Sequence, residues 1–252
     1  MIILKSAQEL EKMRRAGRIV AGTINAVLAK VAPGRTTEDL DRVAATYIHD
    51  QGATPSFLGY RGFTKTICAS INEEIVHGIP SKRRKIAEGD LVSLDFGAIW
   101  EGFHADSAVT VFAGGVARDA DAERLVRTTE RALANAIETI RPGGRLSDIG
   151  DAVERAATAE GLGIVREYGG HGIGRALHED PFIPNFGKAG RGPDLRPGLV
   201  IAVEPMLNLG RDGTRTLDDG WTVVTEDGSL SAHFEHTIAV TDDGHEVLTA
   251  RD

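Results

Sequence analysis

Five side chains of metal-binding types occupy apolar or glycine-rich stretches of the chain: Asp95, Asp106, His171, Glu204 and Glu235. A buried charge is costly unless it is paired or binds a metal. Taken singly, each of these residues is more often an ordinary structural acid or histidine. Together, four carboxylates and one imidazole suit two divalent cations with some carboxylates bridging. A lone zinc ion is less favoured, because zinc prefers more His or Cys ligands.

The sequence around Asp95 and Asp106 predicts how these two acids meet. Residues 91–99 and 105–112 have the composition of strands, and Glu101-Gly102 between them forms a turn. With a two-residue turn, Asp95 faces Ala108, and Asp106 lies diagonally from Asp95 on the same face of the hairpin. Both carboxylates are then within reach of a shared ion.

The elements that must position these residues repeat along the chain. Ser6 and Glu9 form a capping box before a helix expected to reach Val31, and further helices are expected at 37–50, 119–140 and 147–160. Strands are expected at 199–203, 221–224 and 233–240, the last carrying Glu235. A shift of 109 residues aligns helix stops and strand starts, which indicates a duplication. We therefore expect one catalytic domain, 1–252, with pseudo-repeat halves of about 1–115 and 116–252.

Composition limits the class of protein and its partners. The chain has 252 residues, 41% hydrophobic, and a formal net charge of −8. This suits one large folded domain and disfavours nucleic acid as the main partner. Cys68 is the single cysteine, and the first residues lack the apolar stretch of a signal peptide. We expect a cytoplasmic protein that does not bind a membrane.

Three further segments could contribute to function. His77 and His178 are flanked by Gly or Pro, which marks loops, where functional residues concentrate. Lys82-Arg83-Arg84-Lys85 is a basic run in an acidic chain. Its usual meaning is a solvated loop, and a contact with ribosomal RNA is the alternative.

Several strings resemble signatures of the type I methionine aminopeptidases, within the pita-bread metallopeptidases (peptidase family M24). They are Ala69-Ser70-Ile71-Asn72-Glu73-Glu74-Ile75-Val76-His77-Gly78-Ile79-Pro80, Gly102-Phe103-His104-Ala105-Asp106-Ser107, Gly170-His171-Gly172-Ile173-Gly174, Glu204-Pro205 and Phe234-Glu235-His236-Thr237. The resemblance covers essentially the whole chain. It points to the minimal bacterial form, because neither the helical insertion of type II enzymes nor the zinc-binding extension of eukaryotic type I enzymes is visible.

The resemblance implies the pita-bread fold, an α+β architecture. In it, two pseudo-symmetric half-domains share a central curved antiparallel sheet with helices on its outer face. It also implies that the five residues named first hold two divalent metal ions, for which Co, Mn, Fe and Zn all stay open. A dimetal-bound water or hydroxide would attack the carbonyl of the first peptide bond. His178 would hydrogen-bond that carbonyl, His77 the adjacent amide nitrogen, and Glu204 would shuttle the proton.

By the same resemblance, an apolar pocket for the methionine thioether has as its walls Tyr60, Phe63, Cys68, Leu177 and Trp221. The chain departs from familiar members where Arg61 replaces a common histidine, Phe63 a common tyrosine and Leu177 a common aromatic residue. These departures leave the metal ligands intact and bear on the shape of the pocket. Asn72, Glu74 and Ser231 match positions that bind a monovalent cation in relatives.

The resemblance thus implies a metalloaminopeptidase that removes the N-terminal methionine from nascent proteins and peptides when the second residue is small. The expected partners are nascent polypeptide N-termini, with a transient ribosome contact, no stable nucleic acid and no membrane, and we expect a monomer. Two alternatives stay open: a pita-bread binding module that has lost catalysis, and an Xaa-Pro-directed peptidase. The complete ligand set argues against the first, and cleavage of Met-Ala-Ser or of Xaa-Pro peptides separates the second.

Overall fold

Capping boxes start the first two helices of the chain. In the computed structural model, which describes residues 1–251, Ser6 and Glu9 cap α1 (Ala7–Leu28) reciprocally, as predicted. Thr36 and Asp39 cap α2 (Thr37–Asp50) in the same way. Helix α1 ends three residues before the predicted Val31, because the chain turns there and the Val31 N–H bonds to the Leu28 carbonyl.

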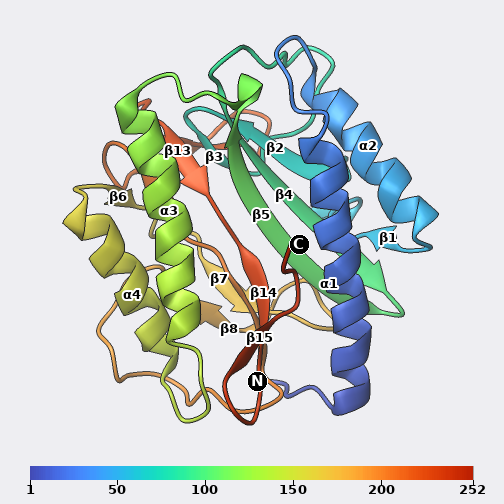
Figure 1. Ribbon diagram of the computed structural model, residues 1–252, viewed down its shortest axis with the longest axis vertical. Helices are drawn as coiled ribbons and strands as arrows, with labels where there is room; N and C mark the ends of the chain where they lie inside the picture. Colours follow the sequence, from blue (N-terminus) through green and yellow to red (C-terminus); the bar gives the residue numbers. More distant parts are fainter. Residues whose placement is uncertain (252) are drawn as a thin grey trace.

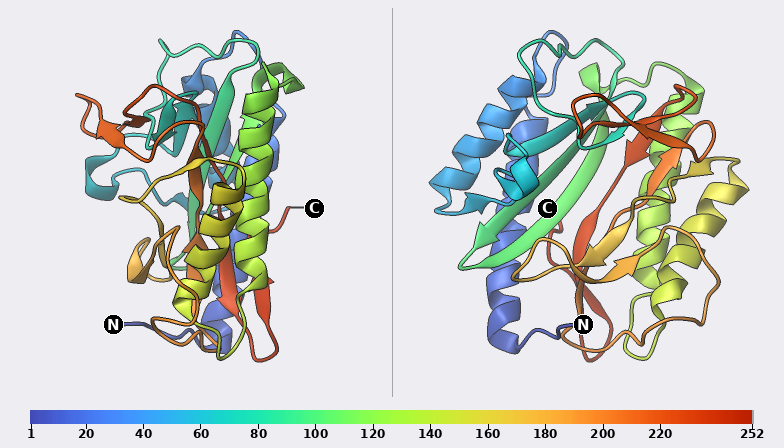
Figure 2. Two further views of the ribbon diagram at one scale, coloured as in Figure 1. Left: turned by 90° about the vertical axis from the view of Figure 1, so that its left-hand side faces the viewer. Right: turned by 180° about the vertical axis from the view of Figure 1, so that it is seen from behind.

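A second helix pair follows the first sheet region, as predicted. It consists of α3 (Ala120–Glu138) and α4 (Leu146–Ala159). Helix α1 packs on the first set of strands and α3 on the second, while α2 and α4 pack against α1 and α3. All four helices cover one side of the strands, and long loops occupy the other side (Figures 1 and 2). The functional surface described below lies on the loop side.

The first half of the chain is built around one long hairpin. Its strands are β1 (Thr54–Pro55), β2 (Ile67–Ile71), β3 (Glu74–Val76), β4 (Leu91–Trp100) and β5 (Phe103–Phe112). Strand β4 pairs with β5 along its whole length, and its other edge pairs with β2 and then β1. The hairpin is long and regular, so it fixes the faces on which its side chains lie.

The second half of the chain uses shorter strands. They are β6 (Gly163–Ile164), β7 (Gly170–Gly172), β8 (Glu179–Ile183), β9 (Val200–Val203), β10 (Met206–Asn208), β11 (Thr214–Thr216), β12 (Val223–Thr225), β13 (Ser231–His233), β14 (His236–Val240) and β15 (His245–Val247). Their hydrogen-bonded orders are β15-β14-β9-β7-β8, β13-β10-β6 and β11-β12-β3. Every strand pair in the described residues is antiparallel. The fold is thus the expected α+β pita-bread arrangement.

The prediction of one continuous strand over 233–240 is wrong, because the structure has two strands there, β13 and β14. The ladder is interrupted, since His233 pairs with Met206 and His236 pairs with Val203. Between these pairs, residues 234–235 and 204–205 keep a single backbone hydrogen bond, from the Phe234 N–H to the Pro205 carbonyl at 3.3 Å. Pro205 has no N–H to donate, so the ladder cannot continue through it. The strand predicted over 221–224 is likewise shifted and begins only at Val223.

The predicted shift of 109 residues pairs glycines that share a left-handed backbone conformation. The pairs are Gly34 with Gly143 (φ 85° and 78°), Gly52 with Gly161 (69° and 66°) and Gly89 with Gly198 (78° and 87°). A positive φ favours glycine over residues with a Cβ. The exact division into halves 1–115 and 116–252 stays a prediction.

Candidate metal centre and adjoining cavities

Asp95 and Asp106 come from the long hairpin. Its turn is Glu101-Gly102, with φ values of 45° and 80°. Asp95 on β4 faces Ala108 on β5, and Asp106 faces Gly97, which is the predicted register. The two carboxylates therefore lie diagonally on one face of the hairpin, on the side away from the helices.

Glu204 and Glu235 come from the interruption in the ladder of the second half. Glu204 follows β9 directly, and Glu235 lies between β13 and β14. The Glu235 backbone pairs instead with the first half, donating to the Ala108 carbonyl at 3.0 Å and accepting from the Ala108 N–H at 3.3 Å. The break thus turns Glu235 toward the hairpin acids.

His171 lies on β7 between two glycines that allow close packing. A Cβ on Gly170 would approach the Ala202 carbonyl oxygen to 2.3 Å, and one on Gly172 would approach the Asp180 oxygen to 2.1 Å. The His171 Nδ1 lies 2.9 Å from the Gly172 carbonyl, so it carries the proton and donates. The Nε2 lone pair is left for a ligand, facing the Glu204 carboxylate at 3.4 Å.

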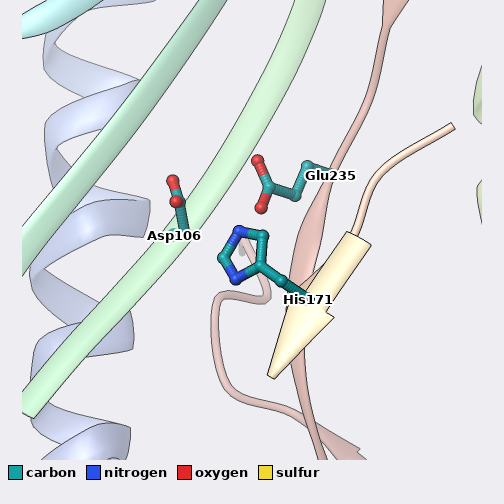
Figure 3. Close-up of side chains that lie close together, drawn as sticks. All are labelled: Asp106, His171 and Glu235. Carbon is teal, nitrogen blue, oxygen red and sulfur yellow. The ribbon is translucent and has the colours of Figure 1, made fainter. Parts of the chain in front are cut away.

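Side-chain hydroxyls join the two halves behind these acids. The Asp106 N–H donates to Thr237 Oγ1 at 2.9 Å, and this hydroxyl donates to the Asp106 carbonyl at 2.7 Å. Ser107 Oγ donates to the Glu235 carbonyl at 2.6 Å. We call this contact between β5 and residues 235–237 the seam. The ligand atoms of Asp106, His171 and Glu235 converge over it within 4.8 Å of one another (Figure 3).

The four carboxylates around the seam, on Asp95, Asp106, Glu204 and Glu235, lack cationic partners within residues 1–251 that would neutralise them. Asp95 Oδ1, Asp106 Oδ1 and Glu235 Oε1 are buried without a hydrogen-bond partner within residues 1–251. Burial raises the pKa of Asp95 to about 7. Burial also raises the pKa of Asp106, Glu204 and Glu235 well above the ordinary range, and repulsion among the carboxylates adds to it. Such a cluster is stable as carboxylates only with bound cations.

The donor chemistry fits divalent cations. Burial lowers the pKa of His171 to about 3, so its imidazole is neutral and able to ligate. Across the described chain, the ion-pair contacts of the four carboxylates are with His171 and His233 alone, and no lysine or arginine reaches them. Carboxylate oxygens with one neutral imidazole are ligands that divalent transition-metal ions accept. Of the five sequence-predicted ligands, Asp106, His171 and Glu235 form the tight cluster, and Asp95 and Glu204 line the same cavity; their role as ligands stays a prediction.

The two loop histidines line the same cavity as the five ligands. His178 stacks on Tyr60 with 5.4 Å between ring centroids, and the Tyr60 hydroxyl lies 2.9 Å from His178 Nδ1. His77 has a left-handed backbone (φ 62°) and packs edge-on against Trp221. Burial lowers the pKa of His77 to about 4. Both rings are thus available as neutral hydrogen-bonding groups.

The cavity that the five ligands line has a volume of about 250 Å³ and also has apolar walls, so we call it the apolar cavity. It includes every residue predicted for the pocket: Tyr60, Phe63, Cys68, Leu177 and Trp221. Phe63 and Trp221 meet edge to face at 5.0 Å between centroids. Burial raises the pKa of the Cys68 thiol well above its ordinary value, so Cys68 acts as an apolar wall residue.

Several residues that line the site were missed from the sequence. Phe57 and Tyr168 line the apolar cavity, and His233 lines a second one of about 200 Å³, which shares Asp95, Glu204 and both loop histidines with the first. His233 Nε2 is buried 3.8 Å from the Glu204 carboxylate and 4.0 Å from that of Glu235. Its position two residues before Glu235, on the same side of an extended chain, was a usable signal. Phe57 and Tyr168 carry no local pattern that distinguishes them.

The predicted monovalent-cation residues lie elsewhere. Ser231 N–H donates to the Asn72 carbonyl at 2.9 Å, so the backbones of these two residues meet. The Asn72 amide bonds to Asp90, and the Glu74 carboxylate accepts from the Ile71 N–H at 2.7 Å. The side chains of Asn72 and Glu74 are thus committed to other partners, and a monovalent cation there stays a prediction.

Comparisons with known proteins agree with the geometry. Residues 11–242 match the family described as metallopeptidase family M24. A methionine aminopeptidase of Clostridium perfringens is 47% identical over 249 residues, 99% of each chain, and methionine aminopeptidase 1 of Mycobacterium tuberculosis is 51% identical over 97% of this chain and 94% of its own. The crystal structure of a methionine aminopeptidase from Thermotoga maritima superposes with a TM-score of 0.97 at 42% identity, over 100% of both chains.

Proposed function

The chain belongs to metallopeptidase family M24, and from this membership we propose that it hydrolyses the first peptide bond of polypeptides that begin with methionine. The observation that carries the proposal is the cluster of partnerless buried carboxylates around neutral His171, at the edge of an apolar cavity. Full-length relatives named methionine aminopeptidase support the same activity. The protein is accordingly a metal-dependent hydrolase.

The proposed cofactor is a pair of divalent cations held by Asp95, Asp106, His171, Glu204 and Glu235. Such ions would activate water and polarise the peptide carbonyl. Co, Mn, Fe and Zn are all compatible with one imidazole and four carboxylates, so the physiological metal stays open. Asn72, Glu74 and Ser231 are proposed for a monovalent cation on the family pattern alone.

The histidines would bind the reacting peptide. With the Tyr60 hydroxyl donating to Nδ1, His178 keeps its proton on Nε2 and can donate it to the oxygen of the scissile carbonyl. His77 would hydrogen-bond the amide nitrogen next to that carbonyl. Glu204 would accept a proton from the attacking water and pass it to the leaving amine. The carboxylates would also hold the substrate's free α-amine, which restricts cleavage to N-termini.

The cavities match a methionine followed by a small residue. The cavity of about 250 Å³ has aromatic and aliphatic side chains in its lining beside the carboxylates, which suits a flexible thioether next to the metal ligands. The second cavity is smaller, about 200 Å³, and Tyr168 and Met206 are among the side chains that line it. A bulky second residue would have to displace these side chains, so we propose cleavage when the second residue is small.

The natural substrates are proposed to be nascent polypeptide N-termini in the cytoplasm, acted on by a monomer. The basic run 82–85 could meet the ribosome transiently, although Arg84 already pairs with Glu74 at 3.0 Å. Within the described residues, none of the helices is long and apolar enough to cross a membrane.

The test is release of free methionine from Met-Ala-Ser by chelator-stripped protein, with and without added Mn²⁺ or Co²⁺. Release that depends on the metal is the expected result. Cleavage of an Xaa-Pro peptide in place of Met-Ala-Ser would support the Xaa-Pro-directed alternative. No release from either peptide by folded, metal-loaded protein would support the binding module.

A further inference from the structure

Arg61 is an exposed cation on the lining of the apolar cavity. It lines that cavity, its side chain is exposed, and among residues 1–251 it forms no ion pair with an acid. Its guanidinium carbon lies 5.4 Å from the centroid of the Tyr60 ring, which in turn stacks on His178.

The backbone around Arg61 is shaped to hold this position. Arg61 has φ 48° and ψ 24°, between Gly59 (φ 86°) and Gly62 (φ 91°). A left-handed conformation is costly for a residue with a Cβ, and such costs concentrate at ligand sites. The turn places the exposed Arg61 side chain on the cavity lining, beside Tyr60 and Phe63.

The path of an extended substrate determines which of its side chains passes Arg61. In an extended chain, side chains of residues i and i+2 lie on the same face, about 7 Å apart. If the first side chain enters the apolar cavity, the second faces the smaller cavity, and the third returns to the rim of the first. That rim carries Arg61, whereas the smaller cavity carries the exposed acid Glu167.

We propose that Arg61 recognises the third residue of the substrate and favours an acidic side chain there. This inference rests on the proposed function, because it assumes that methionine occupies the apolar cavity. The guanidinium supplies several donors in a planar fork that matches a carboxylate. An exposed ion pair of this kind is modest in strength and is screened by salt. Arg61 therefore tunes selectivity among methionine-initiated substrates.

The test compares C-terminally amidated Met-Ala-Asp-Gly, Met-Ala-Lys-Gly and Met-Ala-Ser-Gly, so that no terminal carboxylate competes. For the unaltered protein we expect kcat/KM to be about 2- to 5-fold higher for Asp than for Lys at low salt, and the ratio to approach 1 in high salt. In Arg61→Gln the ratio falls to about 1, and in Arg61→Glu it inverts. Because each ratio is taken within one variant, a general loss of activity does not affect it.

Two matched variants control for charge and position. Arg18→Gln removes the same charge from an exposed position on α1 and should keep the ratio. Glu167→Gln should also keep it. A ratio that survives Arg61→Gln but changes in Glu167→Gln would overturn the inference.

The failure of this inference is distinguishable from failure of the proposed function. Methionine release with the same efficiency from all three peptides would overturn the role of Arg61 alone. Absence of release from every peptide would overturn the proposed function. In that case the same Asp-to-Lys ratio is measured as dissociation constants of the uncleaved peptides by calorimetry, and equal constants would also overturn the role of Arg61.

Discussion

Buried acidic side chains have protein partners in one region of this molecule and lack them in another. Where the N-terminal segment meets the start of β8, Lys5 Nζ lies 2.6 Å from the Glu179 carboxylate, and the side chains are only 3% and 8% exposed. The other Glu179 oxygen accepts the Ala176 N–H at 3.2 Å. At the seam, by contrast, Asp106 and Glu235 are just as buried and each leaves an oxygen without a partner in the described chain.

The difference separates structural acids from acids that await a ligand. Glu179 is completed by the protein itself, and so is Asp41, whose carboxylate accepts the N–H groups of Thr66 and Ile67 at 2.8 and 3.1 Å. The seam acids face one another, so the protein holds them at a cost in free energy that only a cation offsets. Burial alone therefore does not identify a functional acid, whereas burial without a partner does.

Breaking the ion pair between Lys5 and Glu179 should have the largest effect, on the free energy of unfolding. Lys5→Met leaves Glu179 buried and unpaired, so the free energy of unfolding should fall by about 3–5 kcal/mol. Chemical denaturation measures this loss. The double variant Lys5→Met with Glu179→Gln should recover most of it. A single-variant loss below about 1 kcal/mol would mean that the pair behaves as an exposed one.

Neutralising a seam acid should have the opposite effect on the metal-free protein. In Asp106→Asn, metal affinity should fall by more than about 100-fold, because even groups that only support ligands contribute 10- to 100-fold. The thermal midpoint without metal should rise at pH 8, because one repelled charge is gone. Titration calorimetry and thermal melts measure the two quantities.

Asp41→Ala is the matched control for that variant. It should lower the midpoint by leaving two buried N–H groups unpaired, at a cost of about 1–3 kcal/mol each, and leave metal affinity unchanged. Full metal affinity and activity in Asp106→Asn would contradict its assignment as a ligand.

His178→Ala sharpens the comparison by removing a cavity group that is not a predicted ligand. Turnover of Met-Ala-Ser should fall by about 100-fold, as for loss of a hydrogen bond to a developing oxyanion, while metal content stays the same. Tyr60→Phe, which removes only the partner of Nδ1, should reduce turnover less. Protein isolated without metal in the His178 variant would instead make His178 a ligand.

The smallest expected effect is the pH dependence of the stabilisation that a bound metal gives. Burial raises the pKa of Asp95 to about 7, above its value in the unfolded chain, so its contribution to stability is present at low pH and is lost as pH rises through 7. Bound metal removes this loss. The increase in thermal midpoint on adding Mn²⁺ should therefore be larger at pH 8 than at pH 6, by about 2–4 °C. Calorimetry that finds an equal or smaller increase at pH 8 would contradict this.

Local signals predicted the regular parts of the site. The two-residue turn at Glu101-Gly102 was enough to place Asp95 opposite Ala108, because hairpin register follows from turn length. The helix starts at Ser6 and Thr37 followed from capping residues and apolar spacing. The fold class followed from the family resemblance, which carries tertiary information that one stretch of sequence does not. The five candidate ligands were first singled out by their polar types in apolar or glycine-rich stretches, and the resemblance implied that they hold two metal ions.

Tertiary effects account for what was missed. Residues 233–240 were interpreted as one strand, but the opposing Pro205 cannot donate to a ladder, and the pairing breaks there and leaves Glu235 facing the hairpin. Tyr168 and Phe57 approach the cavity from separate loops, with no spacing that relates them to the acids. Partners distant in the chain are not encoded in local periodicity.

The seam also has a mechanical consequence. Asp106 belongs to the first half of the chain, while His171 and Glu235 belong to the second, and hydroxyl bridges from Ser107 and Thr237 run between them. An ion held by these three side chains is a reversible cross-link between segments far apart along the chain. With such an ion bound, chelation would release the cross-link, and pulling the two halves apart would have to break coordination bonds before the remaining contacts yield.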